Sequence, residues 1–396
     1  MVLHSAGVRD IELVAAGQPA GERPRASYSD QSGVEEDMPY ASMILLFATV
    51  AAASTVPAQL DAILKDYGRA DAPGASVLVA QDGKVLYRKA FGLANLEEKA
   101  PITTATNFRL ASVTKQFTAT AVLLLAERGE LSLDDPLTRF FPGFARAAHG
   151  VKVRHLLGHT SGLLDYEDLI PSGTTVPLRD KDVLDLVGKQ DRLYFAPGSQ
   201  FRYSNTGYAL LALIVEKVSG RSFAQFLEKN IFDPLGMAGT VAYQEGISRV
   251  ERRAYGYSER DGEREGERDG RFERTDQSLT SSVLGDGGIY SSVEDLWLWD
   301  QALYGTRLLP AETLAMAFQA GTSTSDQPGS GYGYGWYVTS HRGTRKLWHY
   351  GETIGFSTYL ARYPDKRLTI IMLTNRNDNF LGPTVDRIAD VILATP

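Results

Sequence analysis

Nine consecutive residues, 117–125, read FTATAVLLL, and they constrain the fold of this chain more than any other stretch. The apolar side chains at 122–125 leave no clean polar face, so a helix over residues 114–128 has to be buried between other elements. Gly129 follows in the position where glycine commonly ends a helix. The sequence therefore predicts a central, rigidly held helix directly after Ser112-Val113-Thr114-Lys115.

Ser112 and Lys115 are three positions apart, a spacing that places both side chains on one face of a helix. A serine hydroxyl is a weak nucleophile until a neighbouring base or charge favours the loss of its proton. The lysine amine supplies such a base, and the positive end of the helix dipole favours negative charge developing on the serine. The pair predicts nucleophilic catalysis, although a bare Ser-x-x-Lys pattern also arises by chance in chains of this length.

Composition excludes several classes of function. The chain has 396 residues, of which 43% are hydrophobic and 22% charged, as in globular proteins. Its net charge of -7 argues against a nucleic-acid partner, because phosphate binding requires a basic surface. It has no cysteine, so neither a disulfide nor a thiolate metal site can form. Absence of cysteine fits both a cytoplasm and a bacterial periplasm.

A short apolar run, MILLFATVAAA at residues 43–53, precedes the helix and strand patterns. It is too short for a stable membrane span, and it has the length of the apolar region of a secretory signal. Ala51-x-Ala53 supplies a small-residue cleavage site. We expect a leader over residues 1–53 and a periplasmic or secreted bacterial protein. The alternative is a helix packed on the domain of a cytoplasmic protein, because residues 38–42 carry no Lys or Arg.

Strand patterns lie near both ends of the chain, and most helix patterns lie between them. Strands are expected at 75–80, 85–93, 335–339, 346–349, 356–363 and 367–374, with Asp82-Gly83 as a tight hairpin turn. Further helices are expected at 57–67, 153–157, 180–188, 206–218, 222–231, 293–303 and 385–393. The pattern predicts an α+β fold in which both chain ends form an antiparallel sheet flanked by helices. The α/β part would comprise 54–105 and 283–396, with a mostly helical domain, 106–282, inserted.

Local signals refine this outline. Ser222 with Gln225 forms a capping box, and Asn205 is expected to cap the helix that follows it. The charged stretch 258–277 is expected to be a solvated loop or a hairpin extension. Residues 331–335, GYGYG, resemble half of a dinucleotide fingerprint but lack its strand and helix, which indicates a flexible entry into a strand.

Other catalytic classes have weaker support. His155 and His159 have the spacing of a zinc pair, but no glutamate follows His155 and a third ligand is missing, so a structural turn at 159–162 is the better interpretation. No serine lies in a Gly-x-Ser-x-Gly elbow, and the phosphate-binding Gly-x-x-x-x-Gly-Lys-Ser/Thr loop is absent. We therefore expect neither a metal nor an organic cofactor.

Two further polar motifs complement Ser112 and Lys115. In Tyr203-Ser204-Asn205, a nearby lysine charge would favour the phenolate, so that Tyr203 could relay the serine proton, while Asn205 could bind both the lysine and an acyl amide. The alternative is a simple helix cap. In His349-Tyr350-Gly351, at the end of a predicted strand, the histidine supplies a donor and the glycine would let a substrate backbone approach closely.

The order of these three motifs and the strand–helix–strand layout resemble the penicillin-recognising serine hydrolases over residues 57–393. This superfamily includes class C β-lactamases, D-alanyl-D-alanine carboxypeptidases, D-aminopeptidases and related carboxylesterases. The resemblance implies that Ser112 is acylated, that Lys115 and Tyr203 share the acid and base work, and that Asn205, His349 and Gly351 contact substrate. It also implies an oxyanion hole formed by the backbone N–H groups of Ser112 and Glu352.

One departure bears on the substrate. Class C β-lactamases carry lysine at the position of His349, and a histidine with an ordinary pKa near 6.5 is largely neutral above pH 7. We therefore expect an enzyme that cleaves a D-amino-acid-type peptide or an ester in a small-molecule or peptide substrate. The alternatives are a β-lactamase and a penicillin-binding sensor that is acylated without turnover. Glu352 stands where those families often have a small residue, and the oligomeric state stays open.

Overall fold

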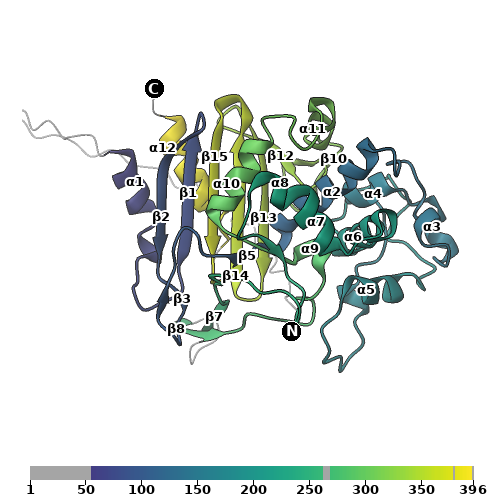
Figure 1. Ribbon diagram of the computed structural model, residues 1–396, viewed down its shortest axis with the longest axis horizontal. Coiled ribbons are helices and arrows are strands. Elements are labelled where there is room, and N and C mark those ends of the chain that lie inside the picture. The colour runs from purple at the N-terminus through teal and green to yellow at the C-terminus, as the bar shows by residue number, and fades with distance from the viewer. Residues whose placement is uncertain (1–54, 262–267, 378–379, 395–396) are drawn as a thin grey trace, which may run out of the picture. The chain divides into compact units, whose positions relative to one another are not determined.

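The computed structural model describes residues 55–261, 268–377 and 380–394, which belong to one compact unit, Ala53–Pro396. The expected leader, 1–53, lies outside the described residues. The main sheet has eight antiparallel strands in the order β10-β11-β12-β13-β14-β15-β1-β2 (Figure 1). Because β1 pairs with β15, strands from both ends of the chain lie side by side, which confirms the expected α+β class.

The strands of the main sheet have the following bounds: β1 Ala75–Gln81, β2 Lys84–Phe91, β10 Thr322–Ser323, β11 Gly331–Tyr332, β12 Tyr337–His341, β13 Thr344–Thr353, β14 Phe356–Tyr363 and β15 Leu368–Thr374. A separate two-stranded sheet consists of β3 Leu93–Asn95 and β4 Ala100–Pro101. A small three-stranded sheet consists of β5 Phe108–Arg109, β6 Val241–Ala242 and β9 Ile289–Ser291. The charged stretch forms a hairpin of β7 Tyr257–Asp261 and β8 Arg268–Arg274, which confirms a hairpin extension.

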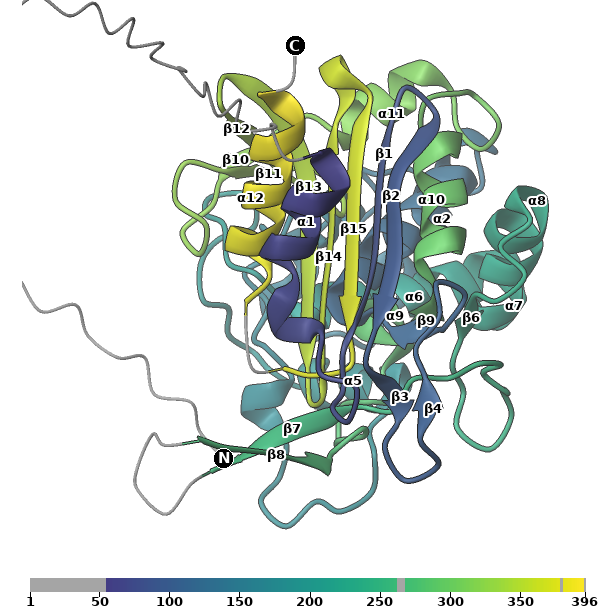
Figure 2. The ribbon, with the colours of Figure 1, turned by 90° about the vertical axis from the view of Figure 1, so that its left-hand side faces the viewer.

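Both faces of the main sheet are covered, as the strand periodicity shows. Along β1, Val77 and Val79 join one apolar cluster, whereas Leu78 and Ala80 join the other, because successive side chains point to opposite faces. The helices α1 (Val56–Ile63) and α12 (Gly382–Leu393) pack on each other and cover the first face (Figure 2). On the second face, α10 (Val293–Ala302) packs on β1 and β15.

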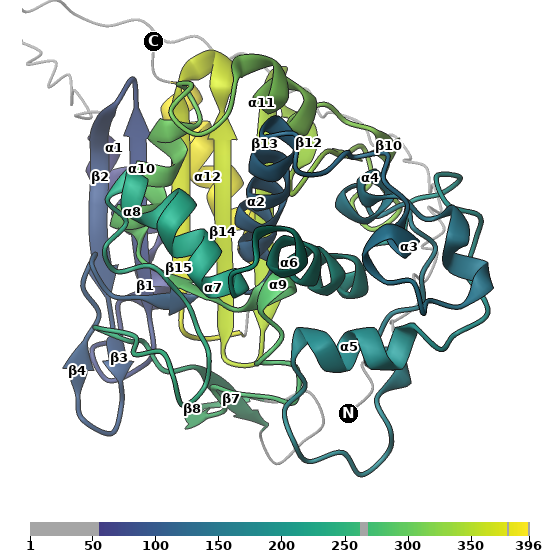
Figure 3. The same ribbon diagram turned by 45° about the vertical axis from the view of Figure 1, so that its right-hand side comes forward.

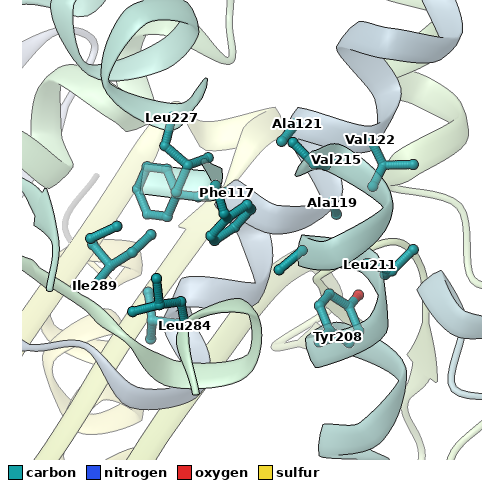
Figure 4. Close-up of a cluster of buried hydrophobic side chains, with 14 of the residues drawn as sticks. Phe117, Ala119, Ala121, Val122, Tyr208, Leu211, Val215, Leu227, Leu284 and Ile289 are labelled. Carbon is teal, nitrogen blue, oxygen red and sulfur yellow. The ribbon is translucent and has the colours of Figure 1, made fainter. Parts of the chain in front are cut away.

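The central helix is α2, Lys115–Glu127, and its residues 115–125 are all buried. Phe117 packs on the rings of Phe232 and Trp299, with centroids 5.8 and 4.5 Å away. The same buried cluster includes Leu211 and Val215 of α6 (Asn205–Ser219) and Leu227 of α7 (Phe223–Leu227) (Figure 4). Gly129 follows α2 with φ +70. The apolar run thus predicted a buried helix and its end correctly.

The remaining helices are α3 Leu137–Phe140, α4 Val153–Leu157, α5 Asp180–Val187, α8 Asp233–Leu235, α9 Leu284–Gly287 and α11 Ala311–Ala317. Figure 3 shows α3, α4, α5 and α6 gathered on the side of the molecule away from β1 and β2. In the part of the chain that the structure describes, no helix combines the length and apolar character needed to cross a bilayer.

Two expectations about the strands near the C-terminus are wrong. Gly331 and Tyr332 form strand β11, and β12 begins only at Tyr337. Gly335 has φ +80, and a Cβ at this position would lie 2.8 Å from the carbonyl oxygen of Lys115. The glycine-rich stretch therefore packs closely against the start of α2 and is not a flexible entry into a strand. The contact with α2 joins segments far apart in the sequence, so local pattern did not predict it.

Candidate active site

Ser112 lies in a 3₁₀ turn, Ala111–Thr114, that leads directly into α2. This turn and the start of the helix bring Ser112 Oγ within 3.0 Å of Lys115 Nζ. The buried Nζ also donates hydrogen bonds to Asn205 Oδ1 at 2.8 Å and to the backbone oxygen of Asp286 at 2.9 Å. These three acceptors use every N–H of an ammonium group and fix its position beside the serine.

Burial lowers the pKa of Lys115 to about 8, against the opposing charges of Asp286, Glu167 and Asp165. Burial likewise raises the pKa of the Asp286 carboxyl, whose Oδ2 accepts a hydrogen bond from the Tyr166 hydroxyl at 3.0 Å. Desolvation disfavours the charged form of each group. A substantial share of Lys115 is therefore a neutral amine near pH 8, ready to accept a proton.

Tyr203 also lies at the serine. Its ring centroid is 4.9 Å from Lys115 Nζ, and its side chain hydrogen-bonds with Ser112. The expectation of a phenolate is wrong, because burial raises the pKa of Tyr203 well above its ordinary value. Loss of hydration outweighs the hydrogen bond with Ser112, which favours the phenolate. Tyr203 is thus a protonated phenol that can donate a proton.

Asn205 links the lysine to the cleft, although not as a helix cap. Its Oδ1 accepts from Lys115, and its Nδ2 donates to Glu167 Oε1 at 3.0 Å, which fixes the orientation of the amide. The cap of α6 is Ser204, whose Oγ accepts from the N–H of Gly207 at 3.3 Å. The sequence assigned the cap one residue too late, because serine and asparagine cap helices about equally well.

His349 is fully buried within β13, and its ring centroid lies 6.2 Å from that of Tyr203. Its Nδ1 donates to the backbone oxygen of Tyr350 at 2.7 Å, so its Nε2 accepts from the Tyr332 hydroxyl at 2.9 Å. Burial, followed by the charge of Lys115, lowers the pKa of His349 to about 3. The expected histidine that titrates near 6.5 is therefore wrong, because the ring is neutral and its nitrogens are bonded within the protein.

Gly351 serves the packing of the nucleophile turn. A Cβ here would lie 2.1 Å from the backbone oxygen of Leu110 and 3.0 Å from the backbone nitrogen of Ser112. Thr358 Oγ1 of β14 donates to the same Leu110 oxygen at 2.7 Å. The close approach predicted for a substrate backbone is thus made by the chain's own backbone, which brings Glu352 beside Ser112.

A cleft of about 260 Å³ opens at Ser112. Its lining includes Asn205, Asp286, Glu167 and Glu352, of which the two glutamates are exposed. Desolvation by the surrounding protein nevertheless raises the pKa of the Glu352 carboxyl. Neither Glu167 nor a role for Asp286 was predicted from the sequence. Both residues act through contacts between segments that are distant in the sequence. No local pattern around Glu167 indicates its hydrogen bond to Asn205.

The two histidines considered as a zinc pair each accept a backbone N–H. His155 Nδ1 accepts from Lys152 at 3.2 Å, and His159 Nδ1 accepts from Ser204 at 3.1 Å. Among residues 55–261, 268–377 and 380–394, no three His, Cys, Asp or Glu side chains form a group that could hold a metal ion. The site therefore combines a serine, an amine and a phenol at a polar cleft.

A family model described as Beta-lactamase matches residues 60–394 of the chain. Penicillin-binding protein 4* of Bacillus subtilis (strain 168) is 35% identical over 327 residues, 81% of this chain and 72% of that protein. D-amino acid amidase from Ochrobactrum anthropi SV3, complexed with L-phenylalanine amide, has a TM-score of 0.72 at 25% identity, covering 85% of this chain and 98% of that chain. EstCE1, a hydrolase with promiscuous acyltransferase activity, has a TM-score of 0.68 at 26% identity, covering 84% and 97%.

Proposed function

The chain belongs to the beta-lactamase family and is a serine hydrolase that acts on amide or ester bonds, and we propose that it does so through an acyl-enzyme on Ser112. The observation that carries this proposal is the 3.0 Å contact between Ser112 Oγ and Lys115 Nζ. A buried amine whose pKa is lowered to about 8 is matched to proton transfer near neutral pH. The pair thus supplies both nucleophile and base.

Acylation follows from the contacts of these groups. The neutral Lys115 amine takes the proton of Ser112 as Oγ attacks the carbonyl carbon, and the ammonium that forms is held by Asn205 Oδ1 and the backbone oxygen of Asp286. The Tyr203 phenol gives its proton to the leaving nitrogen or oxygen and is reprotonated from Lys115. The backbone N–H groups of Ser112 and Glu352 would stabilise the oxyanion.

Deacylation reverses these roles. Water attacks the acyl carbon while the neutral Lys115 amine takes its proton. The bond between the acyl carbon and Ser112 Oγ then breaks, and the Tyr203 and Lys115 pair returns a proton to Oγ, which restores the hydroxyl. The acid product then carries the acyl group. Each step uses groups that already touch one another in the structure, so neither a metal nor an organic cofactor is required for the proposed chemistry.

The charges around the cleft support a peptide or ester substrate over a β-lactam. His349 is neutral, with a pKa of about 3, so the third motif offers no fixed cation to a substrate carboxylate. The cleft carries the carboxylates Glu167 and Glu352. Arg109 also lines it, but this side chain is buried and donates to Gln277 Oε1 and to the backbone oxygen of Ser281. The similarity to a D-amino acid amidase supports a D-amino-acid amide or peptide as the first substrate class to examine.

A substrate panel tests this proposal. The purified chain is mixed with p-nitrophenyl acetate, D-phenylalanine amide and nitrocefin, and product formation is followed from milliseconds to minutes. We expect steady turnover of the amide or the ester at higher kcat/KM than nitrocefin. Faster turnover of nitrocefin would instead identify a β-lactamase, and a single burst without turnover would identify a penicillin-binding sensor.

A further inference from the structure

His159 occupies a costly position that the catalytic groups do not explain. The residue is fully buried and has φ +56, a left-handed conformation that is uncommon for residues other than glycine. Its Nε2 has no hydrogen-bond partner among the described residues. Strained backbone and unsatisfied buried polar atoms concentrate at functional sites, so this residue calls for a specific reason.

The contacts of His159 converge on the two residues that flank Tyr203. Its backbone oxygen accepts the N–H of Arg202 at 2.9 Å, and its Nδ1 accepts the N–H of Ser204 at 3.1 Å. Its ring lies against the Tyr203 ring, with centroids 4.4 Å apart and planes inclined by 32°. One residue thus fixes the backbone on both sides of Tyr203 and supports the face of its ring.

The rest of the ring is enclosed by aromatic side chains. The centroids of Tyr332 and Tyr208 lie 4.5 Å and 5.0 Å from that of His159. Since Nδ1 accepts a hydrogen bond, the neutral ring carries its proton on Nε2. Burial and the charge of Lys115 hold the pKa of His159 well below its ordinary value. The ring therefore supports Tyr203 without adding a second positive charge beside the catalytic amine.

We infer that His159 is a positioning residue that sets the Tyr203 phenol against Ser112, through its Nδ1 bond to Ser204 and its ring contact with Tyr203. This inference rests on the proposed function, because the position of the phenol matters only if Ser112 is acylated. His159 is not one of the residues that line the cleft, so its proposed effect on Ser112 is exerted through Tyr203.

The His159 side chain can be replaced while the turn at residues 159–162 keeps its backbone hydrogen bonds. Three backbone bonds join this turn to the segment before Tyr203: Tyr194 to Gly162 at 2.7 Å, Gly198 to Thr160 at 2.7 Å and Arg202 to His159 at 2.9 Å. None of these bonds needs the imidazole. Only the bond from Ser204 depends on the side chain, so replacing it should release Tyr203 while the turn persists.

Two amide substitutions separate the role of Nδ1 from that of bulk. In His159→Asn, Oδ1 takes the place of Nδ1, and asparagine tolerates the left-handed conformation. In His159→Gln, the amide lies one bond further out and leaves that place empty. Both lose the ring. The matched control is His155→Gln, which makes the same substitution four residues away at a histidine whose Nδ1 also accepts a backbone N–H, that of Lys152.

The measurement is the rate of acylation by p-nitrophenyl acetate, with Tm recorded for each variant. We expect His159→Gln to be acylated about 10- to 100-fold more slowly than wild type. This loss is part of the rate enhancement that a correctly placed general acid contributes. His159→Asn should acylate faster than His159→Gln and more slowly than wild type, because it restores the bond to Ser204 without the ring contact, and His155→Gln should match wild type. An unchanged rate in His159→Gln would overturn the inference.

A double-mutant cycle shows whether His159 acts through Tyr203. Tyr203→Phe should cost a much smaller factor in the His159→Gln background than in wild type, because the phenol is already displaced there, and its full factor in the His155→Gln background. Independent, multiplying factors would overturn the inference even if His159→Gln were slow. Absence of any acyl-enzyme in wild type would refute the proposed function itself, which the cycle cannot do.

Discussion

The protonation state of Lys115 sets the pH dependence of the proposed reaction. The amine acts as a base only when neutral, and burial lowers its pKa to about 8. We therefore predict that kcat/KM for a neutral ester rises with pH up to about 8 and then levels off. Lys115→Arg, which stays charged, should abolish this rise along with most of the activity. A profile that is flat from pH 6 to 9 in wild type would contradict this role.

A second prediction at the residue scale concerns His349. With its pKa at about 3, this ring stays neutral throughout the working range. The ratio of penicillin to ester acylation rates should therefore be constant from pH 5.5 to 8.5, because Lys115 and Tyr203 affect both substrates alike. Stopped-flow acylation with both substrates measures this ratio. An inflection near pH 6.5 that persists in Glu352→Gln, which removes the exposed cleft carboxyl with a raised pKa, would show that His349 titrates with an ordinary pKa.

Sequence reasoning identified Ser112, Lys115, Tyr203 and Asn205, and the structure brings these four together. It misjudged the ionisation of Tyr203 and His349, because the pKa of a buried group depends on desolvation by segments distant in the sequence. Local pattern carries no measure of that burial. The same limit hid Glu167, whose partner Asn205 lies 38 residues away along the chain.

At the scale of the element, two neighbouring residues at the start of α6 have different roles: Ser204 caps the helix, and Asn205 contacts the catalytic lysine. Ser204 is the cap, so Ser204→Ala should lower the free energy of unfolding by about 1 kcal/mol. Asn205 holds Lys115, so Asn205→Ala should leave that free energy nearly unchanged and reduce kcat/KM strongly. Urea denaturation and ester kinetics on both variants provide the test. Reversed effects would restore Asn205 as the cap.

Elements with a strong local signal were predicted well. The apolar run predicted α2, Asp82-Gly83 predicted the turn between β1 and β2, and β14 has the expected bounds, Phe356–Tyr363. Strand β13 proved longer than expected, Thr344–Thr353, because its second half is specified by pairing with β14 and by close packing of Gly351 on the nucleophile turn. Local sequence does not encode either contact.

At the scale of the whole molecule, the antiparallel sheet shared by both chain ends followed from the distribution of strand and helix patterns. We propose further that residues 43–53 act as an export signal, a hypothesis that rests on their sequence alone. Exported protein should begin near Ser54, and a chain lacking residues 1–53 should fold and keep its ester activity, because the first described helix begins at Val56. N-terminal sequencing that finds Met1 or Met38 on exported material would refute the signal.

The central claim is that the substrate acylates Ser112, with Lys115 and Tyr203 as base and acid. Mass spectrometry tests this claim most directly. Wild type and Ser112→Ala are mixed with p-nitrophenyl acetate, quenched in acid within the burst, and measured intact and after digestion. We predict one acetyl group on the peptide that contains Ser112, none in Ser112→Ala, and a loss of turnover in that variant of at least about 10³-fold with Tm preserved. Acetylation of another residue, or a Ser112→Ala variant that keeps a tenth of the activity, would contradict the claim.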